Sequence, residues 1–253
     1  MPLLLKLLLV PSLIAAVSLA GRRWGPNVAG WLSAFPIVSG PILLAIALEQ
    51  GSDFAATAAA NTLLAVLAIL VFSVVYARVA RHKGVFASMT AALLAWALSV
   101  ALLRSLAFPL WAGFAAVLAA LLAAPRLIGQ NQDRKGASPA PARDLPWRMA
   151  AGAALTLAVT AAAAHMGPRL SGMFAMFPVM STVLVGFSHR ASGPGFAVDL
   201  LCGMVRGYYA FAVFCLVLAL LLRAQPLAPA FLAATACALA VQLGLRAAMA
   251  RLK

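Results

Sequence analysis

Long apolar runs constrain this chain more than any other feature of its sequence. A helix that crosses a bilayer needs about 20 mostly apolar residues, and nine stretches of the chain meet that requirement. They are Leu3–Ala20, Val28–Leu48, Phe54–Ala77, Val85–Leu103, Leu106–Ala124, Trp147–His165, Leu170–Phe187, Phe196–Leu222 and Ala228–Met249. Charged residues make up only 9% of the chain, against about 25% in soluble domains. This composition excludes a soluble or intrinsically disordered protein and predicts an all-α, polytopic transmembrane helical bundle.

The basic residues are distributed unevenly over the loops between these runs. Lys and Arg number 19 against 5 Asp and Glu, which gives a net charge of +14. One set of alternate loops holds 14 basic residues, the other set holds four, and Arg206 lies inside a run. Cytoplasmic loops carry such an excess, so nine spans place the N-terminus outside and the C-terminus in the cytoplasm. Because the charges form no single patch on a soluble segment, we expect no nucleic-acid partner.

Two segments depart from the pattern of spans and short loops. Pro125–Pro146 is rich in Gly, Pro, Ser and charge, a composition typical of an exposed loop. The first span ends in Ser18-Leu19-Ala20 before Gly21, and small residues after an apolar run also resemble a signal-peptide cleavage site. We favour a retained first helix, with a cleaved signal peptide as the alternative.

The chain aligns with itself, without gaps, at a shift of 142 positions. The shift superimposes Gly25-Pro26 on Gly167-Pro168, Phe35-Pro36 on Phe177-Pro178, and Gly51 on Gly193. It divides the chain into a first four-helix repeat (1–105), a linking helix with a cytoplasmic loop (106–146) and a second four-helix repeat (147–253). An odd number of crossings before the second repeat inverts it, as in many secondary transporters. Eight crossings, with a hairpin in place of the fourth and fifth spans, would instead make the repeats parallel.

The motifs of the first repeat resemble a known family. The run Ala29-Gly30, Phe35-Pro36 and Glu49-Gln50-Gly51 is similar to the GlpM-like small inner-membrane proteins of bacteria, which are roughly one repeat long. The second repeat keeps the Gly and Phe-Pro positions but has Ala191-Ser192 in place of Glu49-Gln50. The resemblance covers about fifty residues of each half. It implies a multi-span protein of the bacterial inner (plasma) membrane, built as two fused units, and it implies no defined biochemical activity.

A proline lies near the middle of the second span of each repeat. Pro36 and Pro178 lack the N–H of a helical residue and clash with the preceding turn, so the Leu32 carbonyl, for example, loses its helical partner. Inside a bilayer such carbonyls must face protein or water. Ser39 and Ser181 follow within one turn. Two interrupted helices at matching places predict a binding site near the midplane, and plain proline kinks are the alternative.

Arg206 is the second candidate for a binding residue. It lies about ten residues into its run, roughly 15 Å along a helix, where a charge costs at least about 3 kcal/mol and normally faces a partner, a cavity or a substrate. Asp199 lies two turns earlier on the same face. Tyr209, three residues after Arg206, and Asn61, in the third span, are further candidates for polar residues of the binding site. A permanently charged guanidinium favours an anionic group. A structural Arg–Asp clamp is the alternative.

The sequence contains no constellation of catalytic residues. It has no nucleophile motif, no phosphate-binding glycine loop and no metal-like spacing of Cys or His, so we expect no enzyme activity, no cofactor and no metal. We predict a secondary transporter of a small anionic or zwitterionic solute or lipid headgroup, bound between spans two, three, seven and eight. The alternatives are a non-catalytic accessory protein of an envelope biosynthesis or export machine and a membrane enzyme acting on lipid. The bilayer is the expected partner, and a homo-oligomer is left open.

Overall fold

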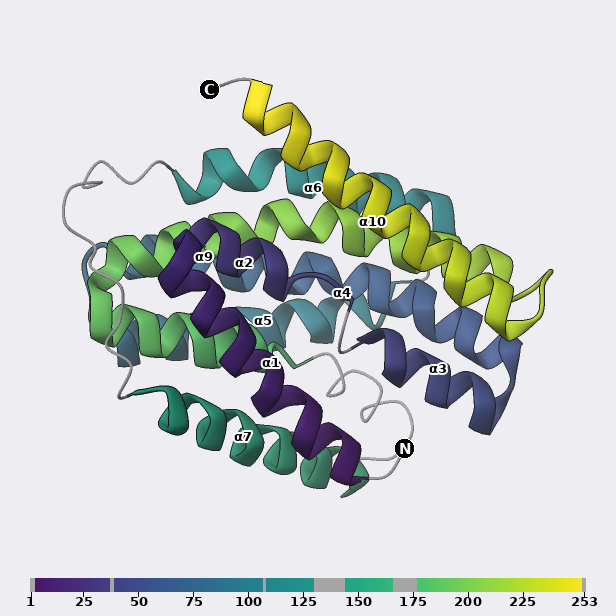
Figure 1. Ribbon diagram of the computed structural model, residues 1–253, viewed down its shortest axis with the longest axis horizontal. Helices are drawn as coiled ribbons and strands as arrows, with labels where there is room; N and C mark the ends of the chain where they lie inside the picture. The colour runs from purple at the N-terminus through teal and green to yellow at the C-terminus, as the bar shows by residue number, and fades with distance from the viewer. Residues whose placement is uncertain (1–2, 37–38, 107, 130–143, 166–176, 252–253) are drawn as a thin grey trace.

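The computed structural model describes residues 3–36, 39–106, 108–129, 144–165 and 177–251. Within these residues the secondary structure is helical and contains no strand. The helices are α1 (Leu3–Trp24), α2 (Pro26–Ser33), α3 (Ser39–Gln50), α4 (Ser52–Val79), α5 (Val85–Leu103), α6 (Leu110–Ile128), α7 (Leu145–His165), α9 (Val179–Leu221) and α10 (Leu227–Arg251). Most of them run from one end of an elongated bundle to the other (Figure 1). The predicted all-α class is confirmed.

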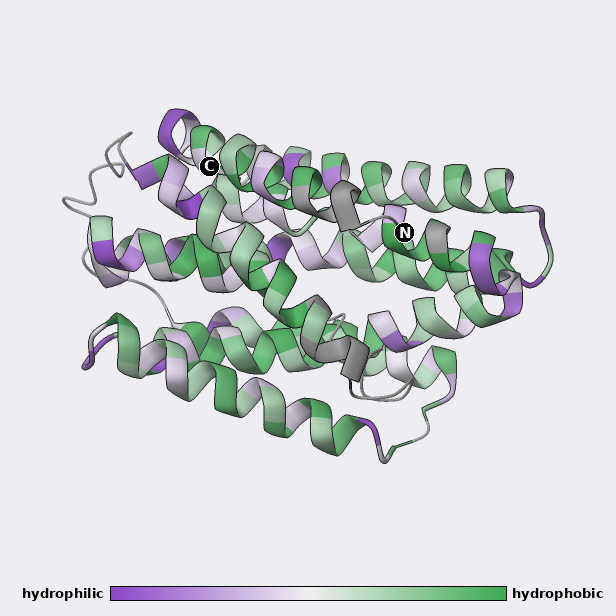
Figure 2. Cartoon of the chain, turned by 90° about the horizontal axis from the view of Figure 1, so that it is seen from below, coloured by the Kyte–Doolittle hydropathy of each residue, from purple (hydrophilic) through white to green (hydrophobic). Residues whose placement is uncertain are grey.

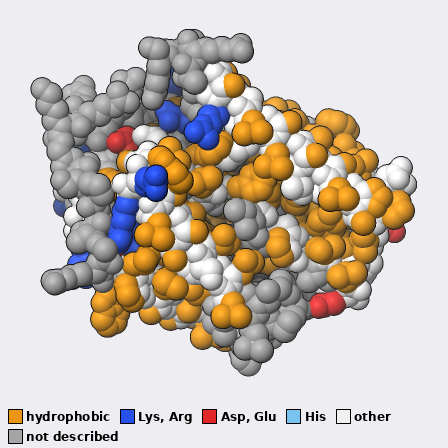
Figure 3. Space-filling view, viewed as in Figure 1, with side chains coloured by type: hydrophobic (Ala, Val, Ile, Leu, Met, Phe, Trp, Pro, Cys, Tyr) orange, Lys and Arg blue, Asp and Glu red, His pale blue; other side chains and the backbone are white. Residues whose placement is uncertain are grey.

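Five of the described helices are long and apolar enough to cross a membrane, namely α4, α5, α6, α9 and α10. Their outward side chains are apolar as well. Along α5, Leu94, Leu98 and Leu102 follow at intervals of four residues and are 66%, 63% and 59% exposed. Apolar side chains cover much of the face seen in Figure 3, and Lys and Arg gather at its left end. Hydrophobic residues also line the helices in Figure 2. The chain is therefore a multi-helix, membrane-spanning protein.

The second predicted span is two helices, not one. α2 ends at Ser33 and α3 begins at Ser39, and Pro36 is buried in the break between them. Because proline has no N–H to continue the helical hydrogen bonds, the helix ends before this position. The Leu32 carbonyl finds a new partner in the N–H of Phe35, at 3.2 Å. The predicted interruption of the span Val28–Leu48 at Pro36 is therefore a full break between two helices and not a plain kink.

Glycine makes the sharp corners between helices. Gly51 separates α3 from α4 with φ 89°, and Gly193 interrupts α9 with φ 84°. Only glycine adopts this left-handed backbone without strain. Gly193 divides α9 into a short arm (179–192) and a long arm (194–221), which correspond to the seventh and eighth predicted spans. Residues 170–176 of the seventh predicted span lie outside the described residues.

The predicted linking helix is displaced along the chain. α6 begins at Leu110, directly after Pro109, and continues through Pro125 to Ile128, whereas Leu106–Ala124 was predicted. The last turn stays closed because the N–H of Gly129 donates to the Pro125 carbonyl at 3.1 Å. The start of the predicted loop Pro125–Pro146 was therefore wrong. α7 begins at Leu145, and residues 130–143 lie outside the described residues.

The long arm of α9 forms the centre of the bundle and packs against α2, α4, α6 and α10. Its contact with α2 brings the two backbones together. A Cβ built on Gly30 would meet the carbonyl oxygen of Leu200, and a Cβ built on Gly203 would meet the carbonyl oxygen of Asn27. Small residues allow such an approach between helices in membranes. The short helix α2 is therefore held by close backbone packing.

The helix boundaries recur with the spacing found in the sequence. α1 begins at Leu3 and α7 at Leu145, while α5 begins at Val85 and α10 at Leu227. α4 ends at Val79 and the long arm of α9 at Leu221. Each pair differs by 142 positions, as do the corners Gly51 and Gly193. Several helix boundaries therefore recur at the shift found in the sequence, although α10 extends six residues further than α5 at this shift.

Candidate functional site

The two prolines at the predicted helix breaks lie inside the bundle. Pro36 and Pro178 are both buried, and α9 begins directly after Pro178. Residues 166–176, which precede this motif, lie outside the described residues. Ser181 is buried in the first turn of α9, and its hydroxyl donates to the sulfur of Met204, in the long arm of α9, at 3.5 Å. Ser39 is half-buried at the first residue of α3.

Arg206 contacts a polar side chain of another helix. Its side chain is exposed, and its guanidinium donates to the amide oxygen of Asn27, at the start of α2, at 3.1 Å. Helical side chains incline toward the N-terminus of their helix, so the guanidinium points toward the Gly193 end of the long arm.

The remaining predicted site residues are dispersed. Asn61 is exposed on α4, whereas Asp199 and Tyr209 are half-buried on the long arm of α9. The predicted set therefore divides into buried residues at the two proline motifs, such as Ser181, and a more exposed group that includes Asn61 and Arg206.

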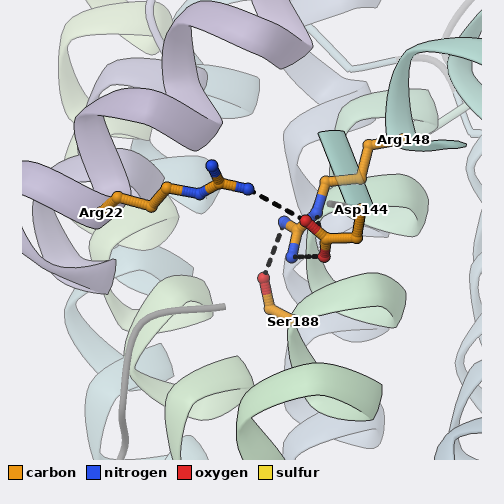
Figure 4. A network of polar contacts seen from close by, with 4 residues as sticks. All are labelled: Arg22, Asp144, Arg148 and Ser188. Atoms are coloured by element: carbon orange, nitrogen blue, oxygen red, sulfur yellow. Dashed lines mark hydrogen bonds and ion pairs between the residues drawn. The ribbon is translucent and has the colours of Figure 1, made fainter. Parts of the chain in front are cut away.

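A buried ionic network joins three helices at the end of the bundle where α1 stops (Figure 4). Asp144 stands at its centre, directly before α7. One carboxylate oxygen accepts from Arg22 of α1 at 3.0 Å. The other accepts from Nε and a terminal nitrogen of Arg148 at 2.9 and 2.8 Å. Arg148 also donates to the hydroxyl of Ser188, on the short arm of α9, at 3.2 Å. We call these four residues the arginine cluster.

The arginine cluster carries a net positive charge, because two guanidinium groups share one carboxylate. The Arg148 side chain is only 4% exposed, and those of Arg22 and Asp144 are each 19% exposed. The Arg148 guanidinium also lies over the ring of Phe187, 5.7 Å from its centroid. Charges withdrawn from water must be paired to be tolerated, and Asp144 provides an ion-pair partner for both guanidinium groups.

A small cavity adjoins the arginine cluster. It has a volume of about 20 Å³ and is lined by Ser18, Arg22, Arg148 and Ser188, with apolar residues of α1, α2 and α9. The hydroxyl oxygen of Ser18 is buried without a hydrogen-bond partner. Such a volume accommodates about one water molecule. The cavity thus offers a polar position for a water or for one atom of a ligand.

The arginine cluster was not predicted from the sequence. Arg22 and Arg148 were counted among the basic residues of the cytoplasmic loops, and Asp144 lay in the predicted exposed loop Pro125–Pro146. One local signal was present, because Asp144 and Arg148 are four residues apart at the start of a helix, a spacing at which opposite charges pair. The other two contacts join residues that are far apart in the chain and depend on the tertiary fold. They are those of Asp144 with Arg22 and of Arg148 with Ser188.

A second buried polar contact lies beside the cluster. The hydroxyl of Tyr76, in α4, is 2.9 Å from Nδ1 of His189, the residue after Ser188. His189 is 8% exposed and Tyr76 is fully buried. The short arm of α9 is therefore joined to α7 through one residue and to α4 through the next.

The described residues contain no group of three His, Cys, Asp or Glu side chains that could hold a metal ion. Comparison with protein-family models, characterised proteins and solved structures found no match to this chain. Inference about function therefore rests on the helix breaks, the arginine cluster and the arrangement of the two halves.

Proposed function

We propose that the chain is a secondary transporter of a small anionic or zwitterionic solute or lipid headgroup, in the inner membrane of a bacterium. The observation that carries the proposal is the break between α2 and α3 at Phe35-Pro36, together with the recurrence of the Phe-Pro motif 142 positions later, directly before α9 begins. Discontinuous helices at corresponding places of two repeats are the usual location of transporter binding sites. GlpM-like ancestry of each half is part of the same proposal.

Reciprocal packing supports two repeats related by a pseudo-two-fold axis. From the first half, Trp96 of α5 contacts Phe177 at the break of the second half, with ring centroids 5.2 Å apart. From the second half, Gln242 of α10 donates to the backbone oxygen of Trp31, in α2, at 3.2 Å. The last helix of each half thus contacts a residue at or beside the proline motif of the other half.

The arginine cluster supports a gate at one end of the proposed pathway. It joins α1, α7 and the short arm of α9 at one end of the bundle, and the cavity beside it holds about one water. In the proposed cycle this end is closed, and separation of Arg22 from Asp144 opens it. Arg206 and Asn27 add a positive group and an amide on the long arm of α9 and at the start of α2.

The topology of the termini tests the inverted repeats. We expect reporters fused to the full chain to place the N-terminus in the periplasm and the C-terminus in the cytoplasm, since basic residues accumulate in cytoplasmic loops. Paired cytoplasmic and periplasmic reporters at each end provide the measurement in a bacterial host. Two cytoplasmic termini would contradict the proposal, because eight crossings make the repeats parallel.

Uptake into proteoliposomes tests transport directly. We expect the purified chain to accelerate entry of at least one of three radiolabelled probes, namely inorganic phosphate, lactate and taurine. Arg206→Ala should lower that uptake about tenfold, the value of one charge-assisted hydrogen bond. Pro178→Ala should also lower it, because alanine supplies the N–H that lets a helix continue through this position. Arg223→Ala, which removes an exposed charge beyond α9, is the matched control. The site would be refuted if both variants folded and transported like the parent.

A non-catalytic accessory role in an envelope biosynthesis or export machine is the second candidate. Two observations favour it, namely the exposure of Arg206 on the outside of the chain and the small size of the cavity beside the arginine cluster. An accessory protein would show the expected topology of the termini but no uptake of any of the three probes. The two measurements above therefore separate the candidates.

A further inference from the structure

A basic pocket opens between the ends of α4 and α6, apart from the arginine cluster. It has a volume of about 440 Å³ and is lined by Arg78, Arg81, His82, Arg126, Leu127 and Gly129. This volume lies within the range of about 300–1,000 Å³ that is typical of ligand sites. Three guanidinium groups and an imidazole face it, and no acidic residue is among the lining residues. The pocket therefore selects for a negatively charged ligand.

Hydrogen bonds to the end of α6 fix two of the guanidinium groups. Arg78 donates through Nε to the carbonyl of Leu127 at 3.1 Å, and Arg81 donates to the carbonyl of Ile128 at 2.5 Å. These carbonyls are among those that a helix C-terminus leaves without a helical partner. Each guanidinium has five N–H donors, so both keep donors for a ligand. Because these hydrogen bonds hold both guanidinium groups in place before a ligand binds, less conformational entropy is lost on binding.

An apolar surface continues from the pocket along α6. Leu127, in the pocket wall, is 46% exposed, and Leu122, one turn before Arg126 on the same side of α6, is 66% exposed. Trp111, at the other end of the same exposed side of α6, is 62% exposed. Arg126 and Trp111 are 15 residues apart, about 22 Å along a helix, and basic and aromatic residues mark the two interfaces of a membrane helix. The pocket thus lies at the level of lipid headgroups, above a surface that fits acyl chains.

We propose that this pocket binds the phosphate group of an anionic phospholipid, with the acyl chains against Leu122 and Leu127. Guanidinium groups recognise phosphate through paired N–H donors, and basic pockets between membrane helices bind anionic headgroups. A soluble phosphate shares the chemistry of the headgroup but would leave the apolar surface unused. The proposal is independent of whether the protein transports a solute.

Lipid titration of the full-length protein in detergent, followed by native mass spectrometry, tests the site. We expect phosphatidylglycerol to bind and phosphatidylcholine, of no net charge, not to bind. Arg126→Gln should weaken binding of phosphatidylglycerol about tenfold, the value of one lost charge-assisted bond. We choose Arg126 because Arg78 and Arg81 also bond the end of α6. Arg190→Gln, at an exposed position of the short arm of α9, removes the same charge outside the pocket and should leave binding unchanged.

Three outcomes would overturn the proposal. Equal binding of the two lipids would show that no anionic site exists. Equal loss from Arg126→Gln and Arg190→Gln would indicate attraction to diffuse surface charge. Inorganic phosphate that bound as tightly as phosphatidylglycerol, and displaced it, would identify a soluble phosphate as the ligand. An unchanged thermal midpoint of Arg126→Gln without lipid shows that a loss of binding is not a loss of folding.

Discussion

Gly203→Ala should lower the thermal midpoint of the detergent-solubilised protein by about 10 °C, because the contact between α2 and α9 leaves no space for a methyl group. The new Cβ would meet the backbone of Asn27, whose carbonyl carbon and Cα both lie 2.9 Å from it. Backbone atoms cannot rotate away as a side-chain end can. Overpacking of this kind costs about 1–3 kcal/mol or more, and we expect the upper end of that range.

Gly244→Ala is the matched control for this prediction. Gly244 lies inside α10, and a Cβ built there meets nothing within 4 Å. Alanine is favoured over glycine inside a helix by about 1 kcal/mol, so the midpoint should stay the same or rise. Equal midpoints for the two alanine variants would show that the backbones of α2 and α9 do not approach each other this closely.

The second large effect is expected from Asp144→Asn, which leaves Arg22 and Arg148 facing each other without a carboxylate. Removal of one partner from a buried ion pair costs about 3–5 kcal/mol. Two of the three side chains are partly exposed, at 19% each, so solvent reduces the expected cost to roughly 2–3 kcal/mol. The thermal midpoint should then fall by about 5–10 °C, as measured by intrinsic fluorescence during heating.

Asp53→Asn serves as the control for Asp144→Asn. Asp53 is exposed in the first turn of α4, where a carboxylate adds only about 0.3–1 kcal/mol through the helix dipole. The same change of charge should therefore have a small effect there. A thermal midpoint for Asp144→Asn as high as that of Asp53→Asn would contradict the buried arginine cluster.

Hydropathy predicted the apolar helices well, because a membrane helix must be apolar along most of its length. The predicted span Val85–Leu103 has the same boundaries as α5. The Phe35-Pro36 motif also predicted the position of a break. Hydropathy could not show that the break separates α2 from α3, since the flanking residues are apolar on both sides and only the missing hydrogen bonds end the helix.

The polar contacts were predicted less well, for a different reason. Arg206 was conspicuous because it interrupts an apolar run, yet the direction of its side chain toward Asn27 depends on where α2 packs. Arg148 was inconspicuous because it lies near a chain segment rich in charge, yet folding buries it to 4% exposure. A sequence shows which charges are unusual for their run, whereas burial depends on neighbours that are distant in the chain.

The arginine cluster has no counterpart in the other half of the chain. A shift of 142 positions relates Arg22 to Ala164, Arg148 to Lys6 and Ser188 to Ile46. In the proposed transport cycle, the interactions that close the two ends of the pathway therefore differ in free energy. A difference of about 2–3 kcal/mol corresponds to a ratio of roughly thirty to more than one hundred between two conformers. Without substrate, most molecules would then have the pathway closed at the end with the arginine cluster and open at the opposite end.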